Sequence, residues 1–182
     1  MSTNPADRLR QLRQTRQVRE FTAEPVEKEA LDAIADAARW SGSSSNTQPW
    51  RFIVITEPST LRAIHAAGLP QTRGMATATA AVAIVLPADP SRAVHDAYDD
   101  GRVAERILVA ARILDIGAGI SWIRSDVRPA IATLLGLPPD RMIRTIVQLG
   151  VPTEAARQPK SKPGEARLPR AEVVFRERWP EG

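Results

Sequence analysis

The chain has 182 residues, of which 43% are hydrophobic and 25% charged, a balance typical of one soluble globular domain. It contains no cysteine, which excludes disulfides, iron–sulfur clusters, thiolate zinc sites and cysteine nucleophiles. The spacing of its two histidines, His65 and His95, does not indicate a metal site. We therefore expect a domain without a metal, stabilised by its own hydrophobic core.

The formal net charge of +4 permits an anionic ligand. Nucleic acid is an alternative partner, but the basic residues are spread along the chain and alternate with acids, as in Asp99, Asp100, Arg102, Glu105 and Arg106. We interpret these charges as solvated helix faces and expect no nucleic-acid partner. The polar first residues and the short apolar stretches predict neither a secretory signal nor a membrane span, so we expect a cytoplasmic protein.

Two helices are predicted in the first quarter of the chain. A short one opens at Asn4-Pro5, because proline is favoured in the first turn. The second ends near Trp40 and has apolar residues at i, i+3, i+4 and i+7, namely Leu31, Ile34, Ala35 and Ala38.

Two more helices are predicted further along. One runs from about residue 97 to residue 116, and Gly117 is its expected C-terminal stop. The other begins after a cap at Ser125 or Asp126 and ends at Gly136.

Runs rich in β-branched residues predict five strands, at 51–56, 81–86, 119–123, 144–149 and 172–175. Strands that alternate with helices indicate a central sheet covered by helices, of the α/β or α+β class. Residues 152–170 combine proline, glycine, lysine and arginine without apolar periodicity, which predicts a loop or an arm. The chain has neither a phosphate loop nor a G-x-S-x-G elbow, and no convincing dinucleotide fingerprint.

Two segments combine residue types that suit a ligand site. In the first, Arg16 and Arg19 are three residues apart, and Val18 and Phe21 can anchor them. Two guanidiniums so placed can hold one phosphate by charge-assisted hydrogen bonds, although two surface arginines are the plainer interpretation. The second segment, 41–52, is a loop of small and polar residues that ends in Gln-Pro-Trp, and it lets a flat ligand approach the backbone.

Together these segments resemble the nitroreductase family of FMN enzymes. Members of that family carry a pattern like R-R-S-V-R-x-F, then E-P-V, and later A-P-S-x-x-N-x-Q-P-W-x-F. The counterparts here are residues 16–21, 24–26 and 41–52. The resemblance continues through a Leu-Gly-Leu-Pro helix end, an Ile-Val-Gln-Leu-Gly-Val-Pro strand and Arg167-Leu168-Pro169, and it covers about residues 8–179.

The resemblance implies an α+β fold in which helices sandwich a central, mostly antiparallel sheet. Residues 1–182 would form a single FMN-binding domain, and residues 152–182 would be a C-terminal arm exchanged in a homodimer. The cofactor-binding residues that the resemblance implies are Arg16, Gln17, Arg19, Gly42, Ser43, Ser44, Asn46, Gly119 and Arg167, with the 43–46 loop contributed by the partner subunit. No side chain is assigned as catalytic, because the chemistry would be centred on the flavin.

The chain departs from the family pattern at several of these positions. Thr15 stands in place of a common arginine, Gln17 in place of a serine, Gly42 in place of a proline, and Glu165 in place of a lysine. Fewer cations at the phosphate would weaken FMN retention. Arg73 is a further candidate for a positive charge near the flavin.

The function that the resemblance implies is ping-pong reduction, in which NADH or NADPH reduces FMN and FMN reduces a nitroaromatic, a quinone or a related small acceptor. One alternative is a specialised flavin enzyme of the same family, acting in dehalogenation or cofactor maturation. A second alternative is a non-catalytic protein that binds flavin or another anionic ligand. We expect no membrane partner.

Overall fold

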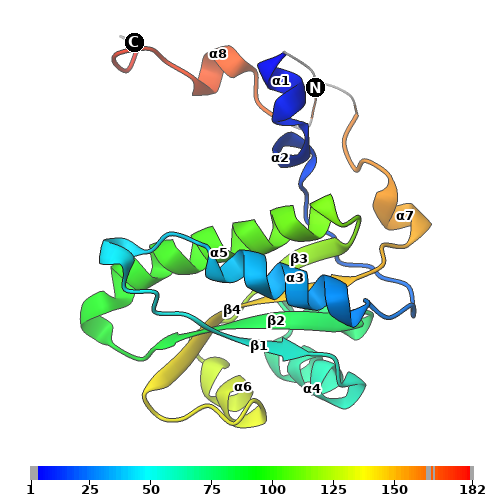
Figure 1. The fold of residues 1–182 in the computed structure, drawn as a ribbon, viewed down its shortest axis with the longest axis vertical. Coiled ribbons are helices and arrows are strands. Elements are labelled where there is room, and N and C mark those ends of the chain that lie inside the picture. Colours follow the sequence, from blue (N-terminus) through cyan, green and yellow to red (C-terminus); the bar gives the residue numbers. More distant parts are fainter. Residues whose placement is uncertain (1–3, 163–164, 166, 181–182) are drawn as a thin grey trace.

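The computed structural model describes residues 4–162, 165 and 167–180, and its centre is an antiparallel sheet of four strands in that part of the chain. The sheet contains β1 (Arg51–Ile55), β2 (Ala80–Pro87), β3 (Gly117–Trp122) and β4 (Arg141–Gly150), in the order β1-β2-β4-β3. The strands predicted at 51–56, 81–86, 119–123 and 144–149 are therefore present. β3 and β1 form the two edges of the sheet (Figure 1).

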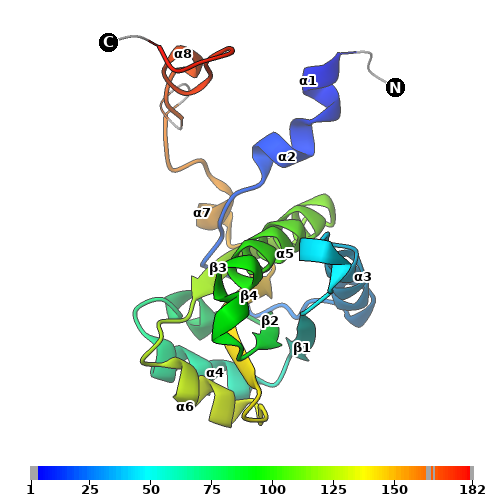
Figure 2. The ribbon, with the colours of Figure 1, turned by 90° about the vertical axis from the view of Figure 1, so that its left-hand side faces the viewer.

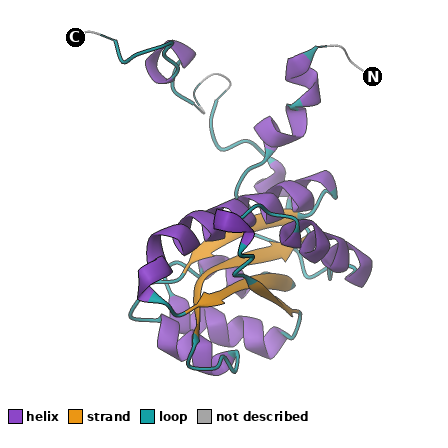
Figure 3. Ribbon diagram, turned by 60° about the vertical axis from the view of Figure 1, so that its left-hand side comes forward, coloured by secondary structure: helices purple, strands orange, loops and turns teal. Residues whose placement is uncertain are grey.

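Helices cover both faces of this sheet, as Figure 3 shows. On one face lie α3 (Lys28–Arg39) and α5 (Ala93–Ile113), and on the other lie α4 (Pro58–Gly68) and α6 (Arg128–Leu134). Short 3-10 turns, η1 (Ser44–Asn46), η2 (Arg73–Ala76) and η3 (Pro90–Arg92), lie in the connections. The α+β fold with an antiparallel sheet between helices is confirmed.

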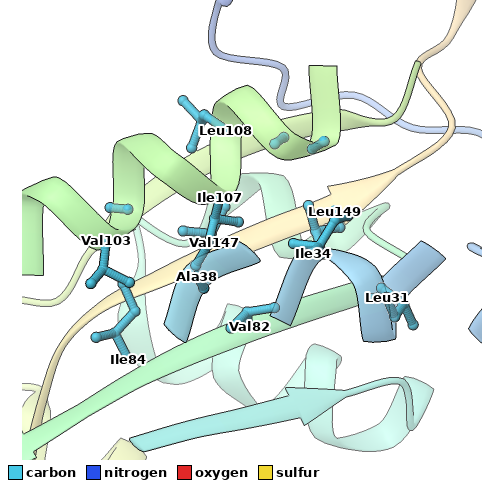
Figure 4. Packing of buried hydrophobic residues seen from close by; sticks show 14 of the residues in the cluster. Leu31, Ile34, Ala38, Val82, Ile84, Val103, Ile107, Leu108, Val147 and Leu149 are labelled. Atoms are coloured by element: carbon cyan, nitrogen blue, oxygen red, sulfur yellow. The ribbon is translucent and has the colours of Figure 1, made fainter. Parts of the chain in front are cut away.

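The core is divided by the sheet into two apolar layers, because side chains alternate along each strand. Val82 and Ile84 of β2 face α3 and α5, where they pack with Ile34 and Ile107 (Figure 4). Ala81 and Ala83 face the other way, and the cluster on that side has these large members: Leu61, Ile64, Ile131, Ile143 and Ile146. β2 is buried on both faces, which explains its almost continuous apolar sequence.

Several helix boundaries differ from the predicted ones. The long helix ends at Ile113, and Gly117 begins β3 instead of terminating the helix. The turn between them is made by Asp115, whose φ is +56°. No side chain caps α6, whose N-cap residue is Val127, so the predicted cap at Ser125 or Asp126 is wrong. Gly136 follows α6 with a φ of +63°, as expected for a glycine after a helix end.

Helix α4 was not predicted, although its first turn carries a recognisable signal. Pro58 occupies the first turn, and the Glu57 side chain accepts a hydrogen bond from the Ser59 amide. Its apolar residues Leu61 and Ile64 are buried. Most of its remaining residues are small, which weakens the periodicity that would reveal it.

The two terminal segments project from the body of the molecule (Figure 2). They carry α1 (Pro5–Arg8) and α2 (Arg10–Gln14) at the N-terminus, and α7 (Glu154–Arg157) and α8 (Arg170–Val173) at the C-terminus. The strand predicted at 172–175 is wrong, because Val173 belongs to α8 and this segment pairs with no strand. Several large apolar side chains of these segments are exposed, namely Leu9, Leu12, Leu168, Val173, Val174 and Trp179.

Candidate functional site

The segment that follows α2 lies along the free edge of β3. The Val18 amide donates to the Ala118 carbonyl at 2.7 Å, and the Ile120 amide donates to the side-chain oxygen of Gln17 at 2.7 Å. Further along, the Thr22 amide donates to the Val151 carbonyl at 2.8 Å. Residues 17–22 are thus fixed between the edge of the sheet and the start of the C-terminal segment.

Gly119 is where this segment approaches β3 most closely. A Cβ atom at this position would lie 2.3 Å from the Val18 carbonyl oxygen, a contact that no larger residue can make without moving the backbone. The glycine therefore allows the N-terminal segment to lie flat against the strand. Gln17, Arg19 and Gly119, three of the residues implied by the resemblance, are brought together here.

Arg19 is partly buried next to Arg73, which comes from η2. Burial, and then the positive charge of Arg73, lower the pKa of the Arg19 guanidinium. Arg19 also donates to the Gln17 side-chain oxygen at 3.1 Å. The two guanidiniums repel each other, and an anion bound beside them would relieve that repulsion.

Gln148 separates the turn that carries Arg73 from the edge that carries Arg19. This fully buried side chain accepts a hydrogen bond from the Ser121 hydroxyl at 2.7 Å. Cβ atoms added at Gly74 and Gly119 would lie 2.2 Å and 2.8 Å from its amide nitrogen. The glutamine thus fills the space between the two segments. The sequence marks it only as a polar residue in an apolar strand, which does not reveal what its side chain contacts.

Arg16 differs from Arg19 in that it binds the backbone of the C-terminal segment. Its guanidinium donates to the carbonyl oxygens of Gln158 and Ala156, each at 2.7 Å, and also to that of Arg157. These carbonyls lie at the end of α7, where backbone acceptors have no partner within the helix. Arg16 therefore ties the C-terminal segment to the N-terminal one, and its contact with a phosphate stays a prediction.

A cavity of about 1240 Å³ opens where these segments meet the second half of α5. Its lining includes the predicted residues Arg16, Gln17, Arg19 and Arg167. Acidic lining residues are Glu20, Glu105 and Asp115, whereas the basic ones are Arg13, Arg16, Arg19, Arg112, Arg157, Lys160 and Arg167. The excess of positive charge suits a ligand with a phosphate group.

The other predicted residues, Gly42, Ser43, Ser44 and Asn46, lie elsewhere. The Ser44 amide donates to Asp99 in the first half of α5, whereas Gln14 of the N-terminal segment contacts Arg112 in its last turn. Thirteen residues of helix separate these two anchors, which corresponds to about 20 Å. A single chain therefore does not bring the two halves of the predicted site together.

The acidic residues in the first half of α5 are buried, which corrects the interpretation of this region as a solvated face. Asp96 and Asp99 are 1% exposed and Asp100 is 6% exposed. Asp100 accepts a hydrogen bond from the Thr145 hydroxyl at 2.6 Å, while burial raises its pKa to about 6. Alternation of charge in the sequence does not reveal which face of a long helix packs against the protein.

Neither a membrane-spanning helix nor a metal-binding cluster is found among the residues that the structure describes. None of the helices at 4–162 and 167–180 has the length and apolar character needed to cross a bilayer. Among the same described residues, no three histidine, aspartate or glutamate side chains gather in a way that would hold a metal ion.

The fold is that of nitroreductases, and the comparison of sequences agrees with it. The model of the Nitroreductase family matches residues 12–74. A protein of Archaeoglobus fulgidus, provisionally named an NADH dehydrogenase/NAD(P)H nitroreductase, is 32% identical over 154 residues, which are 80% of this chain and 86% of the relative. The chain belongs to the nitroreductase family.

Other relatives match shorter stretches. Nitrobenzene nitroreductase of Ectopseudomonas oleovorans is 49% identical over 45 residues, 25% of this chain and 20% of that protein. Iodotyrosine deiodinase of Nematostella vectensis is 33% identical over 58 residues, 32% of this chain and 22% of that protein. These two matches cover a quarter and a third of the chain.

Solved structures share the fold over almost the whole chain. A nitroreductase of Desulfovibrio desulfuricans, solved in complex with FMN, is 26% identical with a TM-score of 0.74, covering 98% of this chain and 100% of that one. A structure from Parabacteroides distasonis has a TM-score of 0.80 at 22% identity and covers 95% and 99%.

Proposed function

We propose that this chain binds FMN and acts as an FMN-dependent NAD(P)H oxidoreductase that reduces small acceptors such as nitroaromatics or quinones by a ping-pong mechanism. The observation that carries the proposal is the strongly basic cavity beside β3, whose lining includes Arg16, Arg19 and Arg167. The structural relative from Desulfovibrio desulfuricans, which contains FMN, supports it. The ribityl phosphate of FMN is an anion of the kind that such a site would stabilise.

The residues present fit the cofactor. Arg19 and Arg167, which line the cavity, would neutralise the phosphate or the electron-rich edge of the flavin, and Arg73 would add its positive charge beside Arg19. Gln17 and the backbone next to Gly119 would contact the polar groups of the cofactor. Bound FMN would supply the hydride and electron transfer, while this chain supplies binding, orientation and local charge. The proposal assigns no proton transfer to a side chain.

The proposed functional unit is a homodimer with the C-terminal arm exchanged. The basic cavity and the 42–46 loop are far apart in one chain, so a complete site needs the loop of a second copy. Exposed apolar residues on both terminal segments, such as Leu12 and Trp179, support contact with that copy. So does Gly101, an unfavourable residue in the middle of α5, where an added Cβ would meet nothing within 4 Å of its own chain.

An absorption spectrum of the purified protein with added FMN tests the proposal. After removal of free flavin, we expect retained flavin bands that bleach anaerobically with NADH or NADPH. The reduced protein should then be reoxidised by a nitroaromatic or a quinone. Failure to retain flavin at excess FMN would contradict the proposal.

Two other outcomes would point to the alternatives. The match to iodotyrosine deiodinase favours, as a second candidate, a specialised dehalogenating member of the family. Loss of iodide from a halogenated phenol in preference to reduction of a nitroaromatic would identify it. Retained flavin that neither NADH nor NADPH bleaches would indicate a protein that binds flavin without this reductase activity.

A further inference from the structure

The loop between α3 and β1 has an unusual backbone. Ser45, Asn46 and Gln48 have φ values of +51°, +52° and +48°. These lie in the left-handed region, which disfavours residues that have a Cβ atom. Three such residues within four positions persist only where the surroundings hold them in place.

Hydrogen bonds among the polar groups of the loop maintain this backbone conformation. The Ser43 hydroxyl accepts a hydrogen bond from the Gln48 amide at 2.9 Å, and the Thr47 hydroxyl donates to the Ser44 carbonyl at 3.0 Å. The Asn46 amide donates to the Ser43 carbonyl at 3.1 Å. These bonds shape the loop but do not fix its position on the protein.

Helix α5 fixes that position. One oxygen of the buried Asp99 carboxylate accepts the Ser44 amide at 3.1 Å, and the other lies 3.4 Å from the Arg102 guanidinium. The Arg92 guanidinium donates to the Thr47 hydroxyl at 3.1 Å. A buried carboxylate that receives an amide from a loop and a guanidinium from its own helix forms a specific, charge-assisted anchor.

Gly42 is part of the same arrangement. A Cβ atom at this position would lie 2.3 Å from a terminal nitrogen of Arg102, so the guanidinium occupies the space that a side chain would need. A larger residue at position 42 would therefore push the Arg102 guanidinium out of its present place beside Asp99. The departure from the proline that is usual in the family is thus coupled to an arginine on α5.

We infer that Asp99 and Arg102, together with Gly42, form a clasp that positions the 43–46 loop. Asp99 and Arg102 are then positioning residues for FMN binding. The part concerning FMN rests on the proposed function, in which Ser44 and Asn46 contact the flavin of the partner subunit. Asp99 holds the loop backbone directly, and Arg102 holds the Asp99 carboxylate in the orientation that receives the Ser44 amide.

Hydrogen exchange measured by mass spectrometry tests the clasp without FMN. In Asp99→Ala we expect exchange of the 43–48 amides to accelerate about ten-fold or more, while β2 stays protected, because the loop has lost its anchor. Asp99→Asn keeps one acceptor oxygen, so its loop exchange rate should lie between those of the wild type and Asp99→Ala. Asp36→Ala, which removes an exposed carboxylate of α3, is the matched control. Unchanged loop exchange in Asp99→Ala would overturn the inference.

A double-mutant cycle tests the coupling and avoids the loss of a buried carboxylate. Gly42→Ala pushes Arg102 aside and Arg102→Ala removes it, so each should weaken FMN binding about five-fold. The double variant should be no worse than either single one, because both remove the same contact. Multiplicative effects, about 25-fold in the double variant, would overturn the coupling. If the wild type bound no FMN, the proposed function would fail. Hydrogen exchange of the loop in Gly42→Ala, Arg102→Ala and the double variant would still test the clasp.

Discussion

Arg73 lies near enough to Arg19, although the two are far apart in the sequence, for its positive charge to lower the pKa of the Arg19 guanidinium in addition to the effect of burial. We expect Arg19→Ala and Arg73→Ala each to weaken FMN binding ten-fold or more, since a hydrogen bond to a charged group contributes about 1.5–3 kcal/mol. Flavin fluorescence titration measures the affinity. Without FMN, Arg73→Ala should not lower the melting temperature, because it relieves a repulsion.

The exposed Arg39 of α3 provides the control for these two variants. Arg39→Ala should leave FMN affinity unchanged. If either site variant bound FMN as tightly as the wild type, that arginine would not be a ligand of the cofactor.

Arg16 should behave differently from Arg19, because it binds protein carbonyls at the end of α7. We expect Arg16→Ala to lower the free energy of unfolding by about 1–3 kcal/mol and to speed tryptic cleavage in the C-terminal segment, with or without FMN. Arg16→Lys should restore only part of this stability, since lysine lacks the planar fork that reaches several carbonyls at once. Full stability in Arg16→Ala, combined with lost FMN binding, would instead assign Arg16 to the phosphate.

Subunit complementation tests the composite site. Arg19→Ala and Asn46→Ala each damage every site in their own homodimers. Random mixing makes half of the dimers hybrid, and each hybrid has one intact site, so about a quarter of wild-type FMN binding should return. The measurement is flavin retained after the two proteins are unfolded and refolded together. No recovery would place Arg19 and Asn46 in the same site of one subunit, whereas undiminished FMN binding by Asn46→Ala alone would place Asn46 outside the site.

The stability of the protein should depend on pH through Asp100. Burial raises its pKa from 3.8 to about 6, so the folded protein binds this proton more tightly than the unfolded chain. The stabilisation is complete below pH 4 and is lost as the pH rises towards 6, by about 3 kcal/mol. Asp100→Asn should abolish this part of the pH dependence in denaturant titrations at pH 4, 5, 6 and 7.

Thr145→Val gives an independent check, because the threonine hydroxyl donates to the Asp100 carboxylate and lowers its pKa. Removing that donor should raise the pKa further, so the pH range over which stability is lost should move upward. An identical slope in the wild type and in Asp100→Asn would show that another group causes the dependence.

The sequence predicts the elements whose patterns are local. Leu31, Ile34 and Ala38 are spaced for a helix that buries them, and all three are buried in α3. The β-branched runs gave four strands correctly. Val173 and Val174 predicted a fifth strand wrongly, because Val173 lies in α8 and the segment lies beside no strand of the described chain that could express its strand preference.

The site was predicted in part, and its remaining features depend on tertiary contacts. The resemblance identified Gln17, Arg19 and Gly119, which the structure places together. It did not identify Gln148, which determines the spacing of two distant segments, or Asp99, which looked like a solvated acid. Both act through their burial, which depends on how α5 and β4 pack and has no signature in the neighbouring residues.

The way Gln17 and Val18 cover β3 also matters for solubility. A bare edge strand offers unpaired amides and carbonyls to any other strand, which is how sheets of different molecules join and aggregate. Here the backbone of Val18 and the side chain of Gln17 occupy the Ala118 carbonyl and the Ile120 amide. Proteolytic loss of the first eighteen residues would therefore expose an unpaired strand edge, so the segment proposed to bind the cofactor also keeps β3 from pairing with strands of other molecules and aggregating.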